Sequence, residues 1–216
     1  MLAVMTWILR PAKESDAAFC GWAAVMAARS QMSRGWFDIV LEREETFVFA
    51  FAKELALAKA RSWWHWSLFH VAEVDGEVVS AMCGFGDNSY YYASRAAMAE
   101  ASDKVGLSKT EQAELWPRGS FIAVTATSEP GAWTIENVAT LPAARGSGVS
   151  GALLDKELDV ARAAGFKRAQ VSFFIGNTRA ARLYEKAGFA FAEERRSAEF
   201  EAAMGTPGTI RYVRDI

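Results

Sequence analysis

Residues 145–151 read Arg-Gly-Ser-Gly-Val-Ser-Gly and combine the residue types that bind a phosphate group. The run follows a β-rich stretch and precedes a stretch with helical spacing. At such a junction the free N–H groups and the positive end of the helix dipole face the loop and attract an anion. The glycines allow tight turns, and the serines add hydroxyl donors. The sequence therefore predicts an anion site in this loop.

The same run also spells G-x-G-x-x-G, the pattern of a dinucleotide site. Such a site expects the first glycine directly after the strand and an acidic residue at the end of the next strand. Here residues 141–145 separate the strand from Gly146, and the next strand ends in FFIGN, without a carboxylate. A P-loop also fails, because no Lys-Ser/Thr pair follows the glycines. A nicotinamide-dependent enzyme is therefore the weaker alternative.

A second pattern in the run has a different meaning. It resembles the pyrophosphate loop of the GCN5-related N-acetyltransferases, Q/R-x-x-G-x-G/A after a strand. The matching residues are Arg145, Gly146, Ser147, Gly148, Val149 and Ser150. Ser150 departs from the pattern, which usually has glycine or alanine there, but serine is small and its hydroxyl can donate to a phosphate.

A further motif follows in the order and register that the same family requires. It reads N-x-x-A-x-x-L-Y-E-K-x-G-F and comprises Asn177, Ala180, Leu183, Tyr184, Glu185, Lys186, Gly188 and Phe189. The resemblance is strong over residues 133–191, moderate over 6–85 and poor over 86–132, which we interpret as a divergent helical insertion.

The resemblance implies a site for acetyl-CoA as co-substrate. It implies a gap between the strand ending at Thr140 and the strand 169–175, in which the pantetheine arm lies like an extra strand. Backbone groups of Val138 and Thr140 would pair with the amides of this arm, and Asn177 would contact it. The pyrophosphate would be held by the amides of Arg145, Gly146, Ser147, Gly148, Val149 and Ser150.

Acetyl transfer to an amine also needs groups that move protons. An attacking amine must be neutral, whereas a lysine-like ammonium has a pKa of about 10.4, so a base or a desolvated pocket is required. Glu136 is the candidate base, although it could instead orient the substrate or face solvent, and Glu73 is a weaker alternative. A backbone N–H near Val138 would hold the oxyanion. By resemblance, Tyr184 would protonate the leaving thiolate.

Residues 61–70 contain three tryptophans and both histidines of the chain. Two histidines without nearby carboxylates or cysteines do not make a metal-ligand set, so we expect no metal. We expect this segment to be core and also one wall of an acceptor pocket, with the tyrosines 90–92 as the opposite wall. The hypothesis that follows is an acceptor with an aromatic or bulky apolar part.

Composition limits the class of protein. The 216 residues are 51% apolar and carry a net charge of −2, which predicts a globular chain without a nucleic-acid surface. Two distant cysteines form no disulfide framework, so we expect a reducing compartment and hence the cytoplasm. No apolar run is long enough for a membrane span, and residues 1–10 fit a first strand better than a signal peptide.

The elements have a mixed order. Strands are expected at 6–12, 121–127, 133–140, 169–175, 189–196 and 209–214, with a hairpin at 69–85 around Asp75-Gly76. Helices are expected from about residue 15 to 29, over 37–61 and in the insertion, including one capped by Ser108, and over 148–164 and from Asn177 to Ala187. The order predicts an α/β (mixed α+β) fold, with a mixed, mostly antiparallel central sheet and helices on both faces.

We therefore interpret residues 1–216 as one acetyltransferase domain. It would carry acetyl from acetyl-CoA to a primary amine of a small molecule or peptide, by direct attack in a ternary complex. A non-catalytic acyl-CoA-binding sensor on the same fold is the other alternative. The acceptor and the oligomeric state are not readable from the sequence, and a homodimer stays open.

Overall fold

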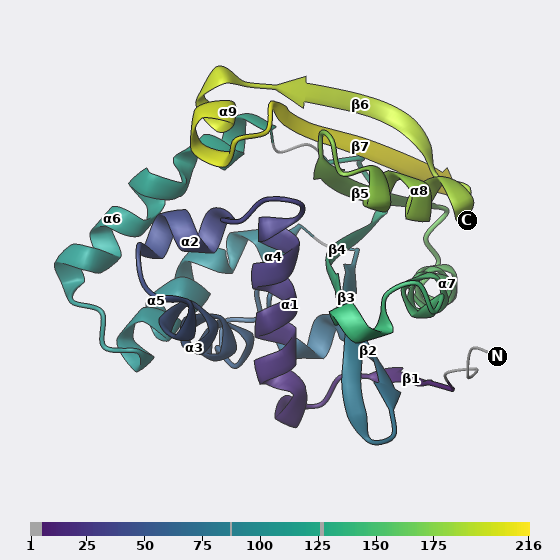
Figure 1. Cartoon of the computed structure of the whole chain (residues 1–216), viewed down its shortest axis with the longest axis horizontal. Helices are drawn as coiled ribbons and strands as arrows, with labels where there is room; N and C mark the ends of the chain where they lie inside the picture. The colour runs from purple at the N-terminus through teal and green to yellow at the C-terminus, as the bar shows by residue number, and fades with distance from the viewer. Residues whose placement is uncertain (1–5, 87, 126–127) are drawn as a thin grey trace.

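The computed structural model describes residues 6–86, 88–125 and 128–216. Within them, seven strands form one twisted sheet in the order β1-β2-β3-β4-β5-β7-β6 (Figure 1). All neighbouring strands are antiparallel except β4 and β5, so the expected mixed, mostly antiparallel sheet is confirmed. The strands are β1 Ile8–Pro11, β2 Phe69–Val74, β3 Glu77–Phe85, β4 Trp133–Thr140, β5 Arg168–Phe174, β6 Ala190–Arg196 and β7 Gly208–Asp215.

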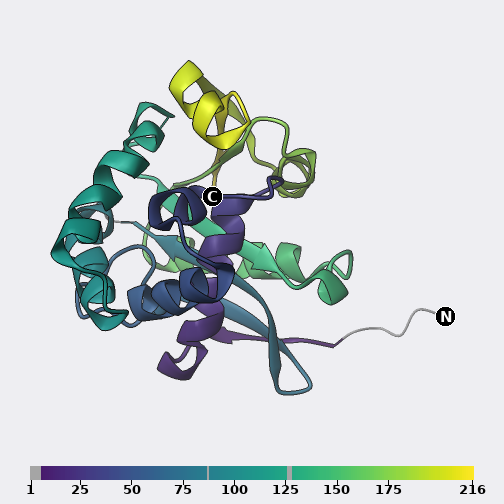
Figure 2. The same ribbon diagram turned by 60° about the vertical axis from the view of Figure 1, so that its left-hand side comes forward.

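Helices cover both faces of this sheet. Helix α1 packs on β3 and β4, whereas α7 and α8 share a buried cluster with residues of the opposite face. Figure 2 shows that the helices between residues 36 and 119 gather on one side of the molecule. The helices are α1 Ala17–Arg29, α2 Trp36–Leu41, α3 Glu45–Ala56, α4 Ser89–Tyr92, α5 Ser94–Lys104, α6 Lys109–Gly119, α7 Val149–Ala163, α8 Thr178–Lys186 and α9 Ala198–Met204. No helix in the described ranges is long and apolar enough to cross a membrane.

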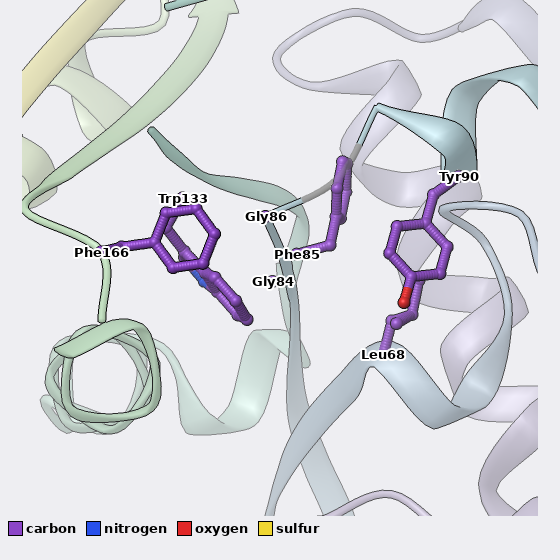
Figure 3. Close-up of a pocket in the computed structure, with 7 residues that line it drawn as sticks. All are labelled: Leu68, Gly84, Phe85, Gly86, Tyr90, Trp133 and Phe166. Atoms are coloured by element: carbon purple, nitrogen blue, oxygen red, sulfur yellow. The ribbon is translucent and has the colours of Figure 1, made fainter. Parts of the chain in front are cut away.

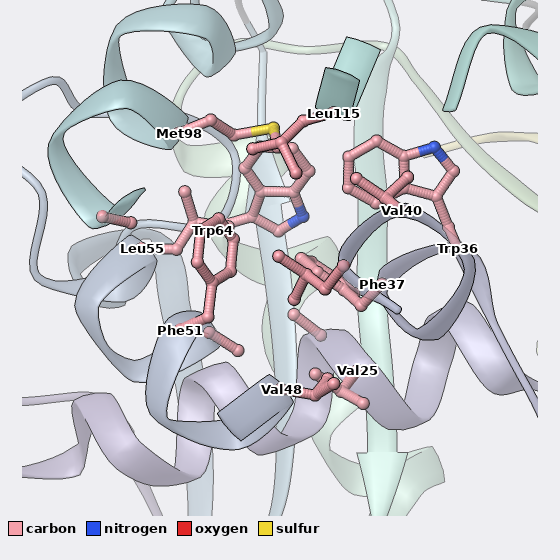
Figure 4. Close-up of a cluster of buried hydrophobic side chains, with 14 of the residues drawn as sticks. Val25, Trp36, Phe37, Val40, Val48, Phe51, Leu55, Trp64, Met98 and Leu115 are labelled. Atoms are coloured by element: carbon pink, nitrogen blue, oxygen red, sulfur yellow. The ribbon is translucent and has the colours of Figure 1, made fainter. Parts of the chain in front are cut away.

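The buried apolar residues form separate hydrophobic clusters. One lies among the helices, where Phe37, Phe51 and Trp64 pack together (Figure 4). Another fills the space between the sheet and α7, whose Leu153 and Leu158 form the predicted core face. Residues of α5 and α6 belong to the first of these clusters, so these two helices share a core with α2 and α3.

Local turn and cap signals in the sequence are confirmed. Asp75 and Gly76 both have positive φ, 50° and 85°, as the type I′ turn of the β2–β3 hairpin requires. Ser108 caps α6 by accepting a hydrogen bond from the Glu111 N–H. Gly165 and Gly188 follow the ends of α7 and α8 with positive φ, which glycine adopts without a Cβ clash.

Three expectations about the elements are wrong. Residues 120–125 form a 3₁₀ helix where a strand over 121–127 was expected, and 126–127 lie outside the described residues. β-Branched residues need a strand partner, but β4 already has β3 and β5 as neighbours, and Phe121 packs on Phe200 instead. The helix expected over 37–61 is broken by Glu42, with φ 48°, and ends at Ala56.

The third error is a missed element. Helix α9 lies in the connection between β6 and β7, where no helix was expected. Its signals are in the sequence: Ser197 caps the first turn, and Phe200 and Met204, four residues apart, are both buried. The helix before Trp116-Pro117 also continues through Pro117 to Gly119.

Candidate active site

A cleft opens where β4 and β5 part. The two parallel strands pair only from Trp133 to Ile135 and from Ala169 to Val171. Beyond these residues no pairing continues in the described structure, and a cleft of about 1430 Å³ lies between the strand ends, the loop before α7 and the start of α8. The gap that the sequence motifs implied is therefore present.

A β-bulge in β4 lies at the point of separation. Asn137 and Val138 together oppose Met82 of β3, so β4 carries one extra residue there. Asn137 has a φ of 53°, a left-handed conformation that asparagine tolerates better than most residues. Its side-chain amide donates to the Trp63 carbonyl at 3.2 Å, which ties the bulge to the tryptophan-rich segment.

Only some backbone N–H groups of the glycine-rich loop lack a hydrogen-bond acceptor in the described structure. The N–H groups of Arg145, Ser147 and Val149 already donate to groups within the loop. Within the described structure, the remaining donors at the entry to α7 have no protein partner; they belong to Gly146, Gly148, Ser150 and Gly151. Gly146 and Gly148 have positive φ, and a Cβ at Gly146 would meet nothing within 4 Å. An anion can therefore approach this backbone.

The side chains of the loop hold its position. Arg145 donates from Nε to the Thr140 carbonyl at 3.1 Å, at the end of β4. The Ser150 hydroxyl is 2.8 Å from Thr140 Oγ1, which is 2.7 Å from the Ser80 hydroxyl on β3. The serine that departs from the family pattern therefore has a local partner, and Ser80 is a contributor that the sequence did not indicate.

Asn177 lines the cleft at the first turn of α8. Its carbonyl oxygen accepts from the Ala180 N–H at 3.0 Å and caps the helix, as its position in the sequence predicted. Its amide donates to the Ser30 hydroxyl at 2.7 Å, so it also connects α8 to the end of α1. Two cations missed in the sequence, Arg179 and Arg182, line the cleft from the same helix. Their three-residue spacing places them on one helix face, a signal that could have found them.

Glu136 lies on the cleft wall, on the strand that borders the gap. The Tyr91 hydroxyl of α4 donates to Glu136 Oε1 at 3.3 Å. Burial raises the pKa of Glu136 to about 7, and the hydrogen bond from Tyr91 opposes this shift. A carboxyl group with a pKa near neutrality is suited to accept a proton. Glu73, the alternative base, does not line the cleft and instead pairs with Arg10 at 2.8 Å.

Tyr184 enters the cleft from α8, on the far side of the gap. Its ring is 4% exposed and packs against Phe173 and Phe189. Burial raises the pKa of the phenol, and the charge of Glu136 raises it further. The phenol therefore stays protonated and can act as a donor.

Aromatic side chains form the wall of the cleft beyond Glu136. Trp63 and Trp64 line it, but Trp66 does not. Tyr91 and Tyr92 also line it, whereas Tyr90 lies elsewhere, so each expected wall is present only in part. Three further aromatic residues that the sequence did not single out complete the wall; they are Trp36, Phe37 and Trp116.

The two histidines have other partners. His65 Nδ1 accepts from the Ser67 N–H at 3.2 Å, and burial lowers the pKa of His65. His70 Nδ1 lies 2.6 Å from Oε1 of Glu157, a fully buried residue of α7. Among the described residues, no group of three or more potential ligands could hold a metal ion.

A second hollow lies near the end of β3, against Trp133 and Phe166 (Figure 3). It measures about 270 Å³ and also contacts Phe85 and Tyr90. Among the described residues that line it, Tyr90 carries the only ionisable side chain, and no cationic side chain contributes. The hollow is therefore a poor candidate for acid–base chemistry, and the candidate active site is the cleft at the parted strands.

Comparisons with known proteins identify the family of the chain. The sequence model of the acetyltransferase (GNAT) family matches residues 36–189. The chain therefore belongs to this family. A comparison with curated protein sequences finds no match.

Solved structures with the same fold are distant in sequence. An acetyltransferase structure aligns with a TM-score of 0.72 and 18% identity, covering 97% of this chain and 99% of that one. An N-acetyltransferase from Staphylococcus aureus Mu50 aligns with a TM-score of 0.67 and 17% identity, covering 96% of this chain and 100% of that one. YncA, a putative acetyltransferase from Salmonella typhimurium, was solved with its cofactor acetyl-CoA. It aligns with a TM-score of 0.52 and 14% identity, covering 97% of this chain and 94% of that one. At these identities the similarity establishes the fold.

Proposed function

We propose that this acetyltransferase moves an acetyl group from acetyl-CoA to a primary amine by direct attack in a ternary complex. The observation that carries the proposal is the placement of Glu136 and Tyr184 on the two sides of the cleft. One group is suited to accept a proton, and the other is held in its protonated form. The Salmonella relative that binds acetyl-CoA supports the choice of co-substrate.

The residues of the cleft fit acetyl-CoA. The free amides at the entry to α7, at Gly146, Gly148, Ser150 and Gly151, are suited to the pyrophosphate. Arg179 and Arg182 add positive charge on the opposite wall. The backbone of Val138 and Thr140 has no strand partner on the β5 side and is suited to the amides of the pantetheine arm. Asn177 would contact the arm from the first turn of α8.

The proton balance of the reaction assigns a role to Glu136. An alkylammonium must lose one proton before its nitrogen can attack the thioester carbonyl, and Glu136 accepts that proton directly or through water. The new N–C bond gives a tetrahedral intermediate with an oxyanion, which the Val138 N–H would stabilise. Because Glu136 already holds the first proton, the second proton of the nitrogen passes through water to the Tyr184 phenolate that forms when the intermediate collapses, and Glu136 then releases the first proton to solvent.

Tyr184 acts at the collapse of the intermediate. The C–S bond breaks, the electron pair leaves with sulfur, and the phenol donates its proton to the thiolate. The route needs no covalent acyl-enzyme. Burial raises the pKa of the Cys83 thiol well above its ordinary value, and Cys83 donates to the Trp63 carbonyl, so it is a poor nucleophile.

We also infer that the chain acts as one acetyltransferase domain in the cytoplasm, with residues 86–132 as an insertion. It would need no nucleic-acid, membrane or metal partner. A homodimer is neither required nor opposed by the site.

Calorimetric titration with acetyl-CoA, with NADH and NADPH as controls, tests the co-substrate. Micromolar binding of acetyl-CoA alone is the expected result, and binding of a nicotinamide alone would overturn the proposal. Release of CoA thiol and mass increase of the amine in a broad amine panel then test catalysis. Tight acetyl-CoA binding without turnover on any amine would favour a non-catalytic sensor.

A further inference from the structure

The charged residues that line the cleft come from only a few of its elements. Among the described lining residues the charged ones are Glu136, Arg145, Arg179 and Arg182. The three arginines come from the glycine-rich loop and α8, which belong to the co-substrate end. Among the described lining residues, α1, α2, α4 and α6 contribute no charged side chain, so the charge that this wall offers an acceptor is the carboxyl group of Glu136.

Aromatic rings continue from that carboxyl group in an unbroken series of contacts. Tyr91, the partner of Glu136, has its ring centroid 5.2 Å from that of Trp63. The Trp63 and Trp64 centroids are 4.8 Å apart, and the Trp64 and Trp36 rings stack at 6.0 Å. Trp36 meets Trp116 of α6 at 6.3 Å. An acceptor whose amine reaches Glu136 must therefore lie against these rings.

We propose that the acceptor is an aromatic monoamine, meaning a flat ring joined to one primary amine, with no second charged group. This inference rests on the proposed acetyl transfer. The single carboxyl group matches the single amine, and the aromatic wall matches the ring. Offset or edge-to-face contacts between rings stabilise binding beyond the burial of apolar area.

A second amine would lower affinity. A primary ammonium is strongly hydrated, and burial without a carboxylate or hydrogen-bond partner is costly. The ring faces attract a cation, but this attraction recovers only part of the lost hydration of a compact ammonium. Diamines of a length that places the far nitrogen against Trp63 or Trp64 should therefore be poor acceptors.

A carboxylate on the acceptor would also lower affinity. It would lie near ionised Glu136, against a wall to which the described residues of α1, α2, α4 and α6 contribute no cation. Amino acids with a free carboxylate should therefore react more slowly than the corresponding decarboxylated amines. This distinguishes an aromatic amine from the aromatic amino acid of the same ring.

The test compares kcat/KM for four amines at saturating acetyl-CoA: 2-phenylethylamine, phenylalanine, butylamine and 1,4-diaminobutane. We expect 2-phenylethylamine to exceed phenylalanine and butylamine by at least tenfold, and butylamine to exceed the diamine of equal length by at least tenfold. Preference for the diamine or for phenylalanine, with measurable turnover, would overturn the inference and leave acetyl transfer standing. No turnover on any amine would instead refute the proposed function.

A matched pair of variants tests whether a ring that lines the cleft causes the preference for 2-phenylethylamine. Trp63→Leu removes a lining ring, whereas Trp66→Leu removes a half-buried ring of the same segment that does not line the cleft. We expect Trp63→Leu to lower the ratio of kcat/KM for 2-phenylethylamine over butylamine at least fivefold, with the KM for acetyl-CoA unchanged, and Trp66→Leu to leave the ratio unchanged. Equal ratios in both variants would overturn the inference, and the wild-type comparison still decides if either variant fails to fold.

Discussion

The proposed chemistry of this site depends on two ionisable side chains whose pKa values are raised by their surroundings. Burial in the cleft wall raises the pKa of Glu136 to about 7, whereas an exposed glutamate titrates near 4.5. Burial and the charge of Glu136 keep Tyr184 protonated. One group is therefore ready to accept a proton at the pH at which the other can still donate one.

Tyr184→Phe removes the proposed proton donor and keeps the ring. We expect turnover to fall at least tenfold, which corresponds to about 1.4 kcal/mol in the activation barrier. Acetyl-CoA affinity should change little, because the remaining ring still packs on Phe173 and Phe189. Steady-state kinetics and calorimetry on the same preparation measure both quantities. Turnover equal to that of the wild type would exclude Tyr184 from the mechanism.

Glu136→Gln removes the proposed base. In the wild type, kcat/KM should rise as pH increases through about 7, because Glu136 must be ionised to accept a proton. In the variant this inflection should disappear, and kcat/KM at pH 8 should fall by about a hundredfold or more. An unchanged inflection would assign it to another group.

The stability of the same variant serves as a folding control, because the ionisation of Glu136 favours activity but destabilises the fold. The pKa of Glu136 is about 7 in the folded chain and near 4.5 when exposed, so the folded state holds this proton more tightly. The contribution of this proton to the free energy of unfolding is fully present below pH 4.5 and is lost as pH rises through 7. The change is at most about 3 kcal/mol. Glu136→Gln should therefore unfold no more easily than wild type at pH 8, so lost activity would not reflect lost stability.

At the scale of elements, the short helix α4 contacts the proposed base. The Tyr91 hydroxyl donates to Glu136 and opposes the rise in its pKa. Tyr91→Phe removes this hydrogen bond, so the pKa of Glu136 should increase further. The acidic limb of the kcat/KM profile should then move to higher pH, by about half a unit or more for a hydrogen bond of about 1 kcal/mol. A limb that stays in place would show that α4 does not influence the base.

Helix α8 depends on Asn177, which both caps it and ties it to α1. Asn177→Ala removes both interactions and should lower the free energy of unfolding by about 1 to 2 kcal/mol. Asn177→Asp keeps an oxygen for the Ala180 N–H but loses the donor to Ser30. Thermal unfolding should therefore rank the alanine variant as the least stable. Equal loss in both variants would mean that the tie to Ser30, and not the cap, stabilises α8.

Most elements that the sequence predicted correctly carry a local signal, although α9 was missed despite its cap and its spacing of apolar residues. Hairpin geometry, helix caps and the spacing around Gly146 and Asn177 depend on residues close in the chain, and all are present in the structure. The strand expected over 121–127 failed because β structure depends on an available neighbouring strand, which local composition does not encode.

The sequence likewise indicated those residues of the candidate site that belong to local patterns, but not their distant partners. Several residues of the two motifs line the cleft, including Arg145, Ser150 and Tyr184, as does Glu136 of β4, whereas Ser147 does not. The contacts of Tyr91 with Glu136 and of Ser80 with Thr140 join residues that are 45 and 60 positions apart. No local pattern predicts which distant side chains will meet, so these partners required the structure.

At the scale of the whole molecule, the sheet consists of two parts joined by a short parallel contact. Strands β1 to β4 form one part and β5, β7 and β6 the other, and β4 pairs with β5 only over Trp133–Ile135. The cleft lies at this junction and takes lining residues from both parts. A co-substrate bound there would contact both, so its binding energy would also oppose their separation.

Acetyl-CoA should therefore stabilise the whole fold. At a concentration of 100 times its Kd, a ligand specific for the folded state adds about 2.7 kcal/mol. For a chain of this length that corresponds to a rise in Tm of about 5 to 10 °C. Amide exchange should slow in Glu136–Thr140 and in Ser172–Phe174, because these segments lack a strand partner across the gap. NADH is the matched control, since it also carries a pyrophosphate but lacks a pantetheine arm. Equal stabilisation by NADH would show that the loop alone binds the ligand and that the parted strands do not take part.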